Sequence, residues 1–286
     1  MEGSSENKFA GWQPLTFAGV AAFARAPLRR LLTVQLLTAS FAAFVVATCF
    51  EMTWAPVIDS ALQQLPATGK IQEQTLIWPE AKPRRLADGK FLAIEVDPTD
   101  RRDLGQSADF LVELGHREWR VHSVFGYVSI SYPGGWVIAL NRAEAEPWWG
   151  AWKPGWMLGL GASVVVALMV SWSVLAALYM PVVRLLAFLT DRRCTRAGAW
   201  RLAGAAMIPG ALFLAVALGL YALLWLNLIE LMVAFLAHFA VGWVFVAIAP
   251  FRLPKILESK SAGSNPFAGE STRKPVKAAP DGETSD

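Results

Sequence analysis

Charged side chains are scarce in this sequence. Asp, Glu, Lys and Arg make up 17% of the 286 residues, compared with about 25% in ordinary soluble domains, while hydrophobic residues make up 55%. Such a composition fits either a large buried core or a membrane protein, so the distribution of the charges along the chain has to decide. The net charge of +3 is small and gives no reason to expect a nucleic-acid partner.

Recognisable reaction motifs are absent as well. The sequence contains no nucleophile elbow, phosphate-binding loop, set of paired zinc cysteines or metalloprotease helix. We therefore predict no catalytic residue, no cofactor site and no metal site, and we expect a protein that is not an enzyme.

Four segments are long and apolar enough to cross a membrane, which takes about 20 residues for roughly 30 Å of hydrocarbon. Residues 31–50 and 156–180 contain no charged residue. Residues 202–251 contain only Glu230 and His238 as ionisable groups and are long enough for two passes and a turn. The sequence therefore predicts transmembrane helices at residues 31–52, 155–180, 203–226 and 229–251.

Lysine and arginine gather at one side of these spans. Four precede the first span, five lie between the second and the third, and three follow the fourth within residues 252–260. The turn at Asn227, between the third and fourth spans, has none. Because short cytoplasmic loops are enriched in Lys and Arg, both termini are predicted to be cytoplasmic and residues 53–154 to lie outside a cytoplasmic (inner) membrane. Cys49 and Cys194 would then lie in different compartments, so no disulfide is expected between them.

Tryptophans crowd the predicted outer ends of the spans. Tryptophan favours the membrane interface, where its ring is buried and its N–H stays hydrated. We interpret six of them as interfacial anchors on one side of the bilayer: Trp54, Trp148, Trp149, Trp152, Trp156 and Trp225.

The predicted outer segment has the pattern of a small α+β domain. Apolar residues recur at helical spacing from Val57 to Leu65, and Pro66 ends that pattern. Short runs rich in Val, Ile, Trp and Tyr follow, separated by turn residues such as Gly115. They predict an antiparallel sheet with one covering helix and with strands near residues 91–96, 110–114, 119–124, 127–132 and 136–140.

The remaining segments are predicted to be cytoplasmic. Within residues 1–30, the stretch 15–30 could form an amphipathic helix on the membrane surface or a simple extension of the first span. Residues 181–202 are predicted to be a basic loop. Residues 252–286, rich in Ser, Gly, Pro, Lys and Glu, are predicted to be a disordered tail. Pro209 is expected to end or kink the third span.

His238 is the most unusual position in the predicted spans. It follows the turn at Asn227 by about ten residues, which at 1.5 Å per residue places it near the middle of the bilayer. Ionisable groups there are costly and usually face the interior of a bundle, so His238 is a candidate functional site with Glu230 as its candidate partner. The simpler interpretation, which we favour, is a neutral imidazole that packs and forms a hydrogen bond with neighbouring backbone or a serine.

Two further patterns have simple structural interpretations. His116, Glu118 and His122 would share one face of a continuous strand, which suggests a metal site, but a solvated polar face is favoured because Gly115 interrupts the strand and no further ligand is near. Gly155 and Gly159 in the second span are interpreted as positions of close helix packing.

Three stretches of sequence carry a resemblance to a known family: Phe23–Arg30, Ile94–Thr99, and Trp200–Ala203 with Ile208–Leu212. In these the chain resembles an uncharacterised bacterial family of membrane proteins, a domain-of-unknown-function group, over residues 20–250. Such proteins have one helix, an extracytoplasmic insert and three further helices. The resemblance implies this architecture and assigns no catalytic residue.

The expected fold is thus a membrane α-helical bundle of four transmembrane helices, with a small extracytoplasmic α+β domain between the first and the second. We expect a non-enzymatic binding, scaffolding or sensing protein of the cell envelope. Its helices would contact the lipid bilayer, and its outer domain would bind an envelope protein or a ligand. The alternative is a small transporter or channel component that uses His238 and Glu230.

Overall fold

Four helical segments are long and apolar enough to cross a membrane in the computed structural model, which describes residues 13–101 and 105–255. Each overlaps one predicted span, so the prediction of four such helices is confirmed for the described residues. The four segments are Leu28–Gln63, Arg142–Leu189, Arg196–Ala222 and Leu228–Arg252.

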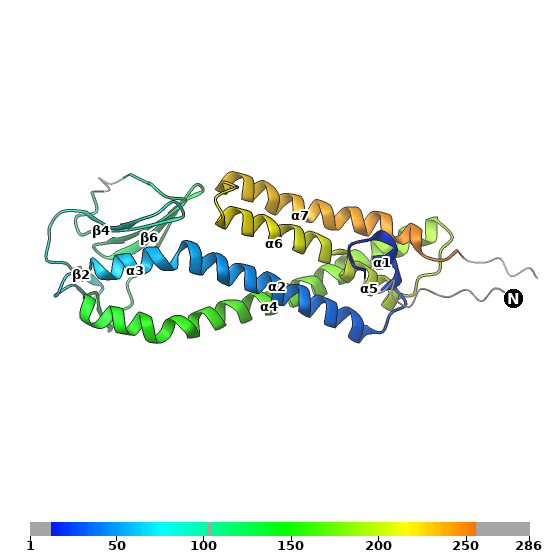
Figure 1. Cartoon of the computed structure of the whole chain (residues 1–286), viewed down its shortest axis with the longest axis horizontal. Coiled ribbons are helices and arrows are strands. Elements are labelled where there is room, and N and C mark those ends of the chain that lie inside the picture. The colour runs from blue at the N-terminus through cyan, green and yellow to red at the C-terminus, as the bar shows by residue number, and fades with distance from the viewer. Residues whose placement is uncertain (1–12, 102–104, 256–286) are drawn as a thin grey trace, which may run out of the picture.

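The long helices lie side by side, and the strands gather at one end of the molecule (Figure 1). The first and the last helical elements, α1 (Phe17–Ala22) and η2 (Ala249–Arg252), contact each other at the opposite end. The chain therefore enters and leaves the bundle at the same end. We call the two ends the sheet end and the far end.

The first two segments extend further into the sheet end than predicted. Helix α2 (Leu28–Thr53) continues almost directly into α3 (Ala55–Gln63), which has Pro56 in its first turn, where a missing N–H costs nothing. Helix α4 (Arg142–Leu189) begins at Arg142, and not at residue 155 as predicted. Asn141 caps it by accepting a hydrogen bond from the Glu144 N–H. Pro147 and Pro154 lie inside the helix without ending it.

The predicted basic loop of residues 181–202 is mostly helical, which corrects the sequence interpretation. Helix α4 runs on through Pro181 to Leu189, and α5 (Arg196–Ala206) begins only six residues after Thr190, capped by Thr195. The third segment breaks at Met207, because Pro209 occupies the first turn of a new helix, α6 (Ile208–Ala222). Helix α7 (Leu228–Ile248) and η2 complete the fourth segment.

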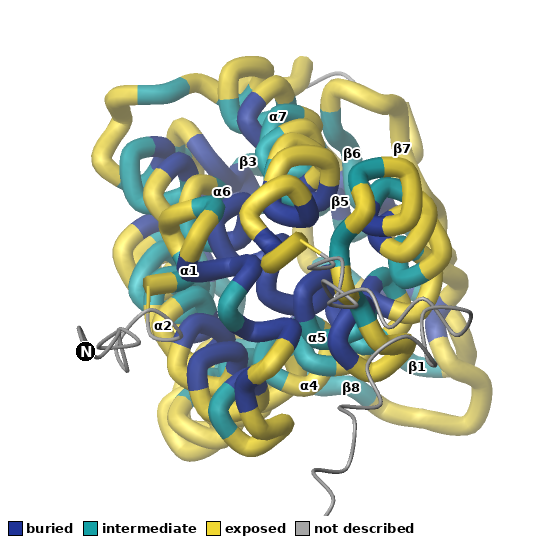
Figure 2. The backbone as a smooth tube through the Cα atoms, turned by 90° about the vertical axis from the view of Figure 1, so that its right-hand side faces the viewer, coloured by how far each residue is buried: buried dark blue, intermediate teal, exposed yellow. Residues whose placement is uncertain are grey.

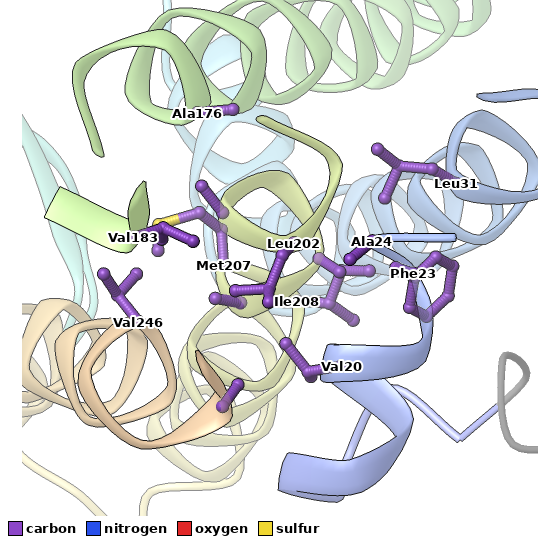
Figure 3. Close-up of a cluster of buried hydrophobic side chains, with 14 of the residues drawn as sticks. Val20, Phe23, Ala24, Leu31, Ala176, Val183, Leu202, Met207, Ile208 and Val246 are labelled. Carbon is purple, nitrogen blue, oxygen red and sulfur yellow. The ribbon is translucent and has the colours of Figure 1, made fainter. Parts of the chain in front are cut away.

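The segment before α2 is folded into the bundle instead of lying on its surface. Helix α1 has only six residues, and Pro27 separates it from α2, so neither an amphipathic helix over residues 15–30 nor an extension of α2 forms. Val20 and Phe23 are completely buried in one apolar cluster with Leu202 and Ile208 (Figure 3). The predicted disordered tail lies outside the described residues from residue 256 onward.

Helices α5 and α6 form the centre of the bundle. In the most apolar part of the segment Arg196–Ala222, which contains both helices, 61% of the residues are buried, compared with 11% in the most apolar part of α4. A Cβ atom at Gly210 would collide with the backbone carbonyl of His238 on α7, so these two helices approach closely. Gly155 and Gly159 meet no neighbouring helix, so the prediction of close packing there is wrong. Seen from the far end, buried residues occupy the middle and exposed residues the rim (Figure 2).

The sheet end contains two sheets where one antiparallel sheet was predicted. The larger sheet is mixed, because β4 and β5 are parallel while its other neighbouring strands are antiparallel. The smaller sheet has the order β2-β1-β8 and is antiparallel. The larger consists, in order, of β3 (Arg84–Asp88), β4 (Leu92–Asp97), β5 (Phe110–Gly115), β6 (Glu118–Ser123) and β7 (Gly126–Ser131), and the smaller of β1 (Lys70–Gln72), β2 (Thr75–Ile77) and β8 (Val137–Ala139).

Strands β4 to β8 agree with the predicted positions to within one residue at each end, whereas β1 to β3 were not predicted. Helix α3 is the predicted covering helix, since Ala61 and Val57 share a buried apolar cluster with Val96 and Leu114 of the larger sheet. The prediction of a small α+β unit between the first two long segments is confirmed. We call residues 64–141 the sheet domain.

Candidate functional site

Glu230 and His238 are not brought together. Glu230 belongs to a capping box at the start of α7, in which its carboxylate accepts from the Asn227 N–H at 2.8 Å and its own N–H donates to Asn227 Oδ1 at 2.9 Å. His238 lies two helical turns further on. Glu230 therefore has a structural role that explains its presence in an apolar segment.

His238 lines an apolar cavity of about 340 Å³ inside the bundle, together with residues of α2, α4, α6 and Met207. Its ring Nδ1–H donates to the backbone carbonyl of Phe235, and its ring lies 3.9 Å from that of Phe239, centre to centre. These contacts are all local to α7. Such contacts are compatible with the simpler interpretation of His238, a neutral imidazole that packs and forms a hydrogen bond with neighbouring backbone.

The six tryptophans divide into two groups. Trp148, Trp152, Trp156 and Trp225 are exposed, as interfacial anchors would be. Trp149 is half-buried, and its indole N–H donates to Asp59 Oδ1 at 2.7 Å, which joins α4 to α3. Trp54 lies at the α2–α3 joint with its ring 5.5 Å from that of Phe110 in the sheet domain. Two of the predicted anchors thus connect elements to one another.

Two adjoining apolar cavities lie where the sheet domain meets the helices. The first, of about 710 Å³, is walled by α2, α4, α6 and α7, with Phe110 of β5 at the sheet end. The second, of about 660 Å³, lies between α3, β8 and the first turns of α4. Ile58 and Trp149 line both cavities, so the two cavities adjoin at these residues, and we call them together the junction groove.

A small ionic cluster lies beside the junction groove. The Lys153 ammonium of α4 is 2.8 Å from Glu51 Oε1 of α2 and 3.7 Å from Asp59 Oδ2 of α3. Lys153 lies one turn from Trp149 and one turn from Trp156, which both line the groove. Sequence reasoning missed this cluster; the available signal was the helical spacing of Trp149, Lys153 and Trp156.

The sheet domain also touches the α6–α7 hairpin directly. The Tyr221 hydroxyl at the end of α6 donates to Asp109 Oδ2 at 2.7 Å, just before β5. The Tyr221 ring meets the Phe91 ring edge to face, with their centres 4.8 Å apart. Tyr221 also lines the first cavity, so the groove is closed at this side by residues that join the sheet domain to the helices.

A row of charged residues crosses the larger sheet on the face opposite α3. Arg85, Glu95, Glu113 and Arg120 are direct neighbours on β3 to β6. Glu95 and Glu113 are only 2% and 1% exposed, and described residues of the β4–β5 connection contact both ends of the row: the Gly105 carbonyl accepts from Arg85, and Asp100 pairs with Arg120. Arg120 donates to Glu113 Oε1 at 2.6 Å, whereas Arg85 approaches Glu95 Oε2 only to 3.5 Å.

Burial raises the pKa of Glu95 to about 7, an effect that the nearby Arg85 guanidinium partly offsets. Both carboxylate oxygens of Glu113, in contrast, have a close partner: Arg120 donates to Oε1, and His122 Nε2 lies 2.8 Å from Oε2. His122 is thus within hydrogen-bond distance of Glu113, and Glu118 pairs with Arg120, while His116 lies in the β5–β6 turn. Among the described residues no three potential metal ligands converge.

The structure therefore offers two candidate sites of different chemistry. The charged row can hold or release a proton but is covered, whereas the junction groove is accessible and apolar. The chain matches no protein-family model, and it has no significant match among curated proteins or among solved structures. Its function has to be inferred from the geometry described above.

Proposed function

We propose that the protein is a non-enzymatic binding protein of the cytoplasmic membrane that holds an apolar ligand in the junction groove. The proposal rests on two apolar cavities of about 710 and 660 Å³, which share Ile58 and Trp149 as lining residues. Both cavities lie between the long helices and the sheet domain and are lined by residues of both. Both volumes fall in the range of small-molecule sites, roughly 300–1,000 Å³. A ligand here would touch both parts of the protein at once, as a binding or sensing role requires.

The same proposal assigns an orientation. The sheet domain lies outside the cytoplasm, and both ends of the chain lie inside. This follows from the arginines of the far end, which are carried by the α4–α5 connection and by the segment leading into α2. An alkaline phosphatase reporter fused after Lys255 is expected to be inactive, and one inserted at the exposed Lys82 active; the reverse pattern would exclude this orientation.

The binding proposal is tested with N-phenyl-1-naphthylamine, a neutral dye whose emission rises in apolar sites. Full-length protein in nanodiscs is expected to show saturable binding above the linear partition into empty nanodiscs. Leu62 lines the second cavity, so Leu62→Trp fills it and should lower the saturable component. Ser60 lies on the same helix but is exposed, so Ser60→Trp serves as the control. Emission that rises only linearly, as with empty nanodiscs, would refute the proposal.

One observation favours transport as a second candidate function. His238 lines a cavity of about 340 Å³ between the long helices, and an ionisable group in such a place can take part in a proton path. Replacing His238 with Leu should then reduce proton flux into proteoliposomes, measured with a pH-sensitive dye, without loss of folding. Unchanged flux in a folded His238→Leu protein counts against transport.

A further inference from the structure

The first cavity of the junction groove is built by the apolar helices themselves. Val46 of α2 lies about two turns from Trp54, and Leu160 of α4 lies about one turn from Trp156. With the tryptophans at the membrane interface, these wall residues would lie at the depth of the acyl chains next to the sheet domain. Trp156 of α4 is 57% exposed although it lines the cavity, so the cavity reaches the protein surface at this residue.

Three polar side chains on the wall of this cavity already have partners. Thr53 Oγ1 donates to the Cys49 carbonyl at 2.7 Å, the Tyr221 hydroxyl donates to Asp109, and the Trp149 indole N–H donates to Asp59. A sugar, nucleotide or amino acid would have to bury its polar groups there without hydrogen bonds, which costs several kcal/mol. The wall therefore selects an apolar chain.

Charge appears only at the rim. The Lys153 ammonium lies within 4 Å of both the Glu51 and the Asp59 carboxylate, and about half of each carboxylate side chain is exposed. With one ammonium and two carboxylates the cluster has a net charge of −1, so its half-exposed carboxylates complement the amine of a headgroup that carries both signs, whose phosphate would then face the aqueous side. Apolar cavity and charged rim together fit an amphipathic molecule.

The cavity should not stay empty in a bilayer. Water has no polar partners inside it, and an empty cavity forfeits the dispersion contacts of its lining. A lipid chain leaves one apolar medium for another, so burial itself contributes little, and the gain comes from filling the space and from the rim. We propose that the first cavity holds an acyl chain of a zwitterionic membrane phospholipid; this rests on the proposed binding function and names its ligand class.

The test uses native mass spectrometry of the full-length protein after incubation with nanodiscs of dioleoyl phosphatidylethanolamine, or with micellar oleic acid. The wild type is expected to retain one phospholipid. Met157 lines the cavity, whereas its neighbour Leu158 is 77% exposed. Met157→Trp should lower the lipid-bound fraction by about tenfold, equivalent to 1.4 kcal/mol, and Leu158→Trp should not.

A second pair on α6 keeps the test decisive if Met157→Trp does not fold. Leu218 lines the cavity and Val216 is exposed, so Leu218→Trp should lose the phospholipid and Val216→Trp should keep it. Retention of oleic acid alone, or equal retention within both pairs, overturns the inference. Saturable dye binding by a protein that retains no phospholipid overturns the lipid assignment and leaves the proposed function standing. Failure of both measurements removes both.

Discussion

Glu95 is expected to make the sheet domain less stable as the pH rises. Its pKa is raised, mainly by burial, from 4.5 to about 7, so the folded protein holds the proton more tightly than the unfolded chain does. The corresponding stability is fully present below pH 4.5 and is lost as the pH rises through about 7. This is the opposite of the usual behaviour of a salt-bridged carboxylate. Replacing Glu95 with Gln, which cannot ionise, should remove this dependence.

The size of the effect follows from the difference between the two pKa values. At 1.36 kcal/mol per pKa unit, a rise from 4.5 to about 7 corresponds to about 3 kcal/mol. The pairing with Arg85 is already contained in this figure, because it lowers the pKa that burial raises. At pH 8, Glu95→Gln should therefore stabilise the sheet by up to about 3 kcal/mol, and at pH 5 by much less.

Hydrogen–deuterium exchange measures the local opening free energy of the sheet. It is followed in peptides from β4 and β5, with the full-length protein in detergent micelles. Glu95→Gln should slow exchange about a hundredfold relative to the wild type at pH 8 and only about fourfold at pH 5. Glu80, a half-exposed partner of Arg84, gives the control variant Glu80→Gln. Equal exchange rates of the wild type and Glu95→Gln at pH 8 would show that ionisation of Glu95 does not lower the stability of the folded sheet, which would contradict the prediction.

Three further predictions concern the bundle and its contact with the sheet domain. Gly210→Ala should markedly lower the melting temperature in micelles because a Cβ there meets the α7 backbone, whereas Gly219→Ala, with open space on the same helix, should be neutral or slightly stabilising. Asn227→Ala removes the cap of α7 and should cost about 1 kcal/mol of unfolding free energy. Tyr221→Phe leaves Asp109 without this donor, so amide exchange at the start of β5 should become faster by tenfold or more, corresponding to the roughly 1.5–3 kcal/mol of a hydrogen bond to a charged group.

The long helices and most strands could be predicted because their signals are local. An apolar stretch identifies α7 wherever the chain places it, and the alternation in β4 to β7 depends only on neighbouring residues. The pairing of β4 with β5 could not be predicted, since a parallel neighbour is set by the path of residues 98–109 and not by the strands themselves. The start of α4 was missed because the second span was predicted from a stretch without charged residues, and four charged residues lie in the first turns of the helix: Arg142, Glu144, Glu146 and Lys153.

The charged row shows why a local signal can mislead about burial. Glu95, Glu113 and Arg120 alternate with apolar residues along their strands, which is the usual pattern of a sheet with one solvated face. In the structure this face is covered: Asp100 and Gly105 of the β4–β5 connection contact Arg120 and Arg85, and Glu95 and Glu113 are almost completely buried. The perturbed carboxyl is thus a product of tertiary structure, although every residue in it is visible in the sequence.

The junction groove is even harder to predict from the sequence, because a cavity depends on how helices and strands pack against one another. Asp59 and Trp149 are 90 residues apart, and neither suggests the other. His238 attracts attention because an imidazole in an apolar segment is costly, yet its hydrogen bond stays within its own helix turn. Trp149 attracts none, because tryptophan at a membrane interface is ordinary. A search for costly residues therefore points to α7, whereas Trp149, whose side chain lines two cavities and whose indole N–H joins α4 to α3, becomes noticeable only in the structure.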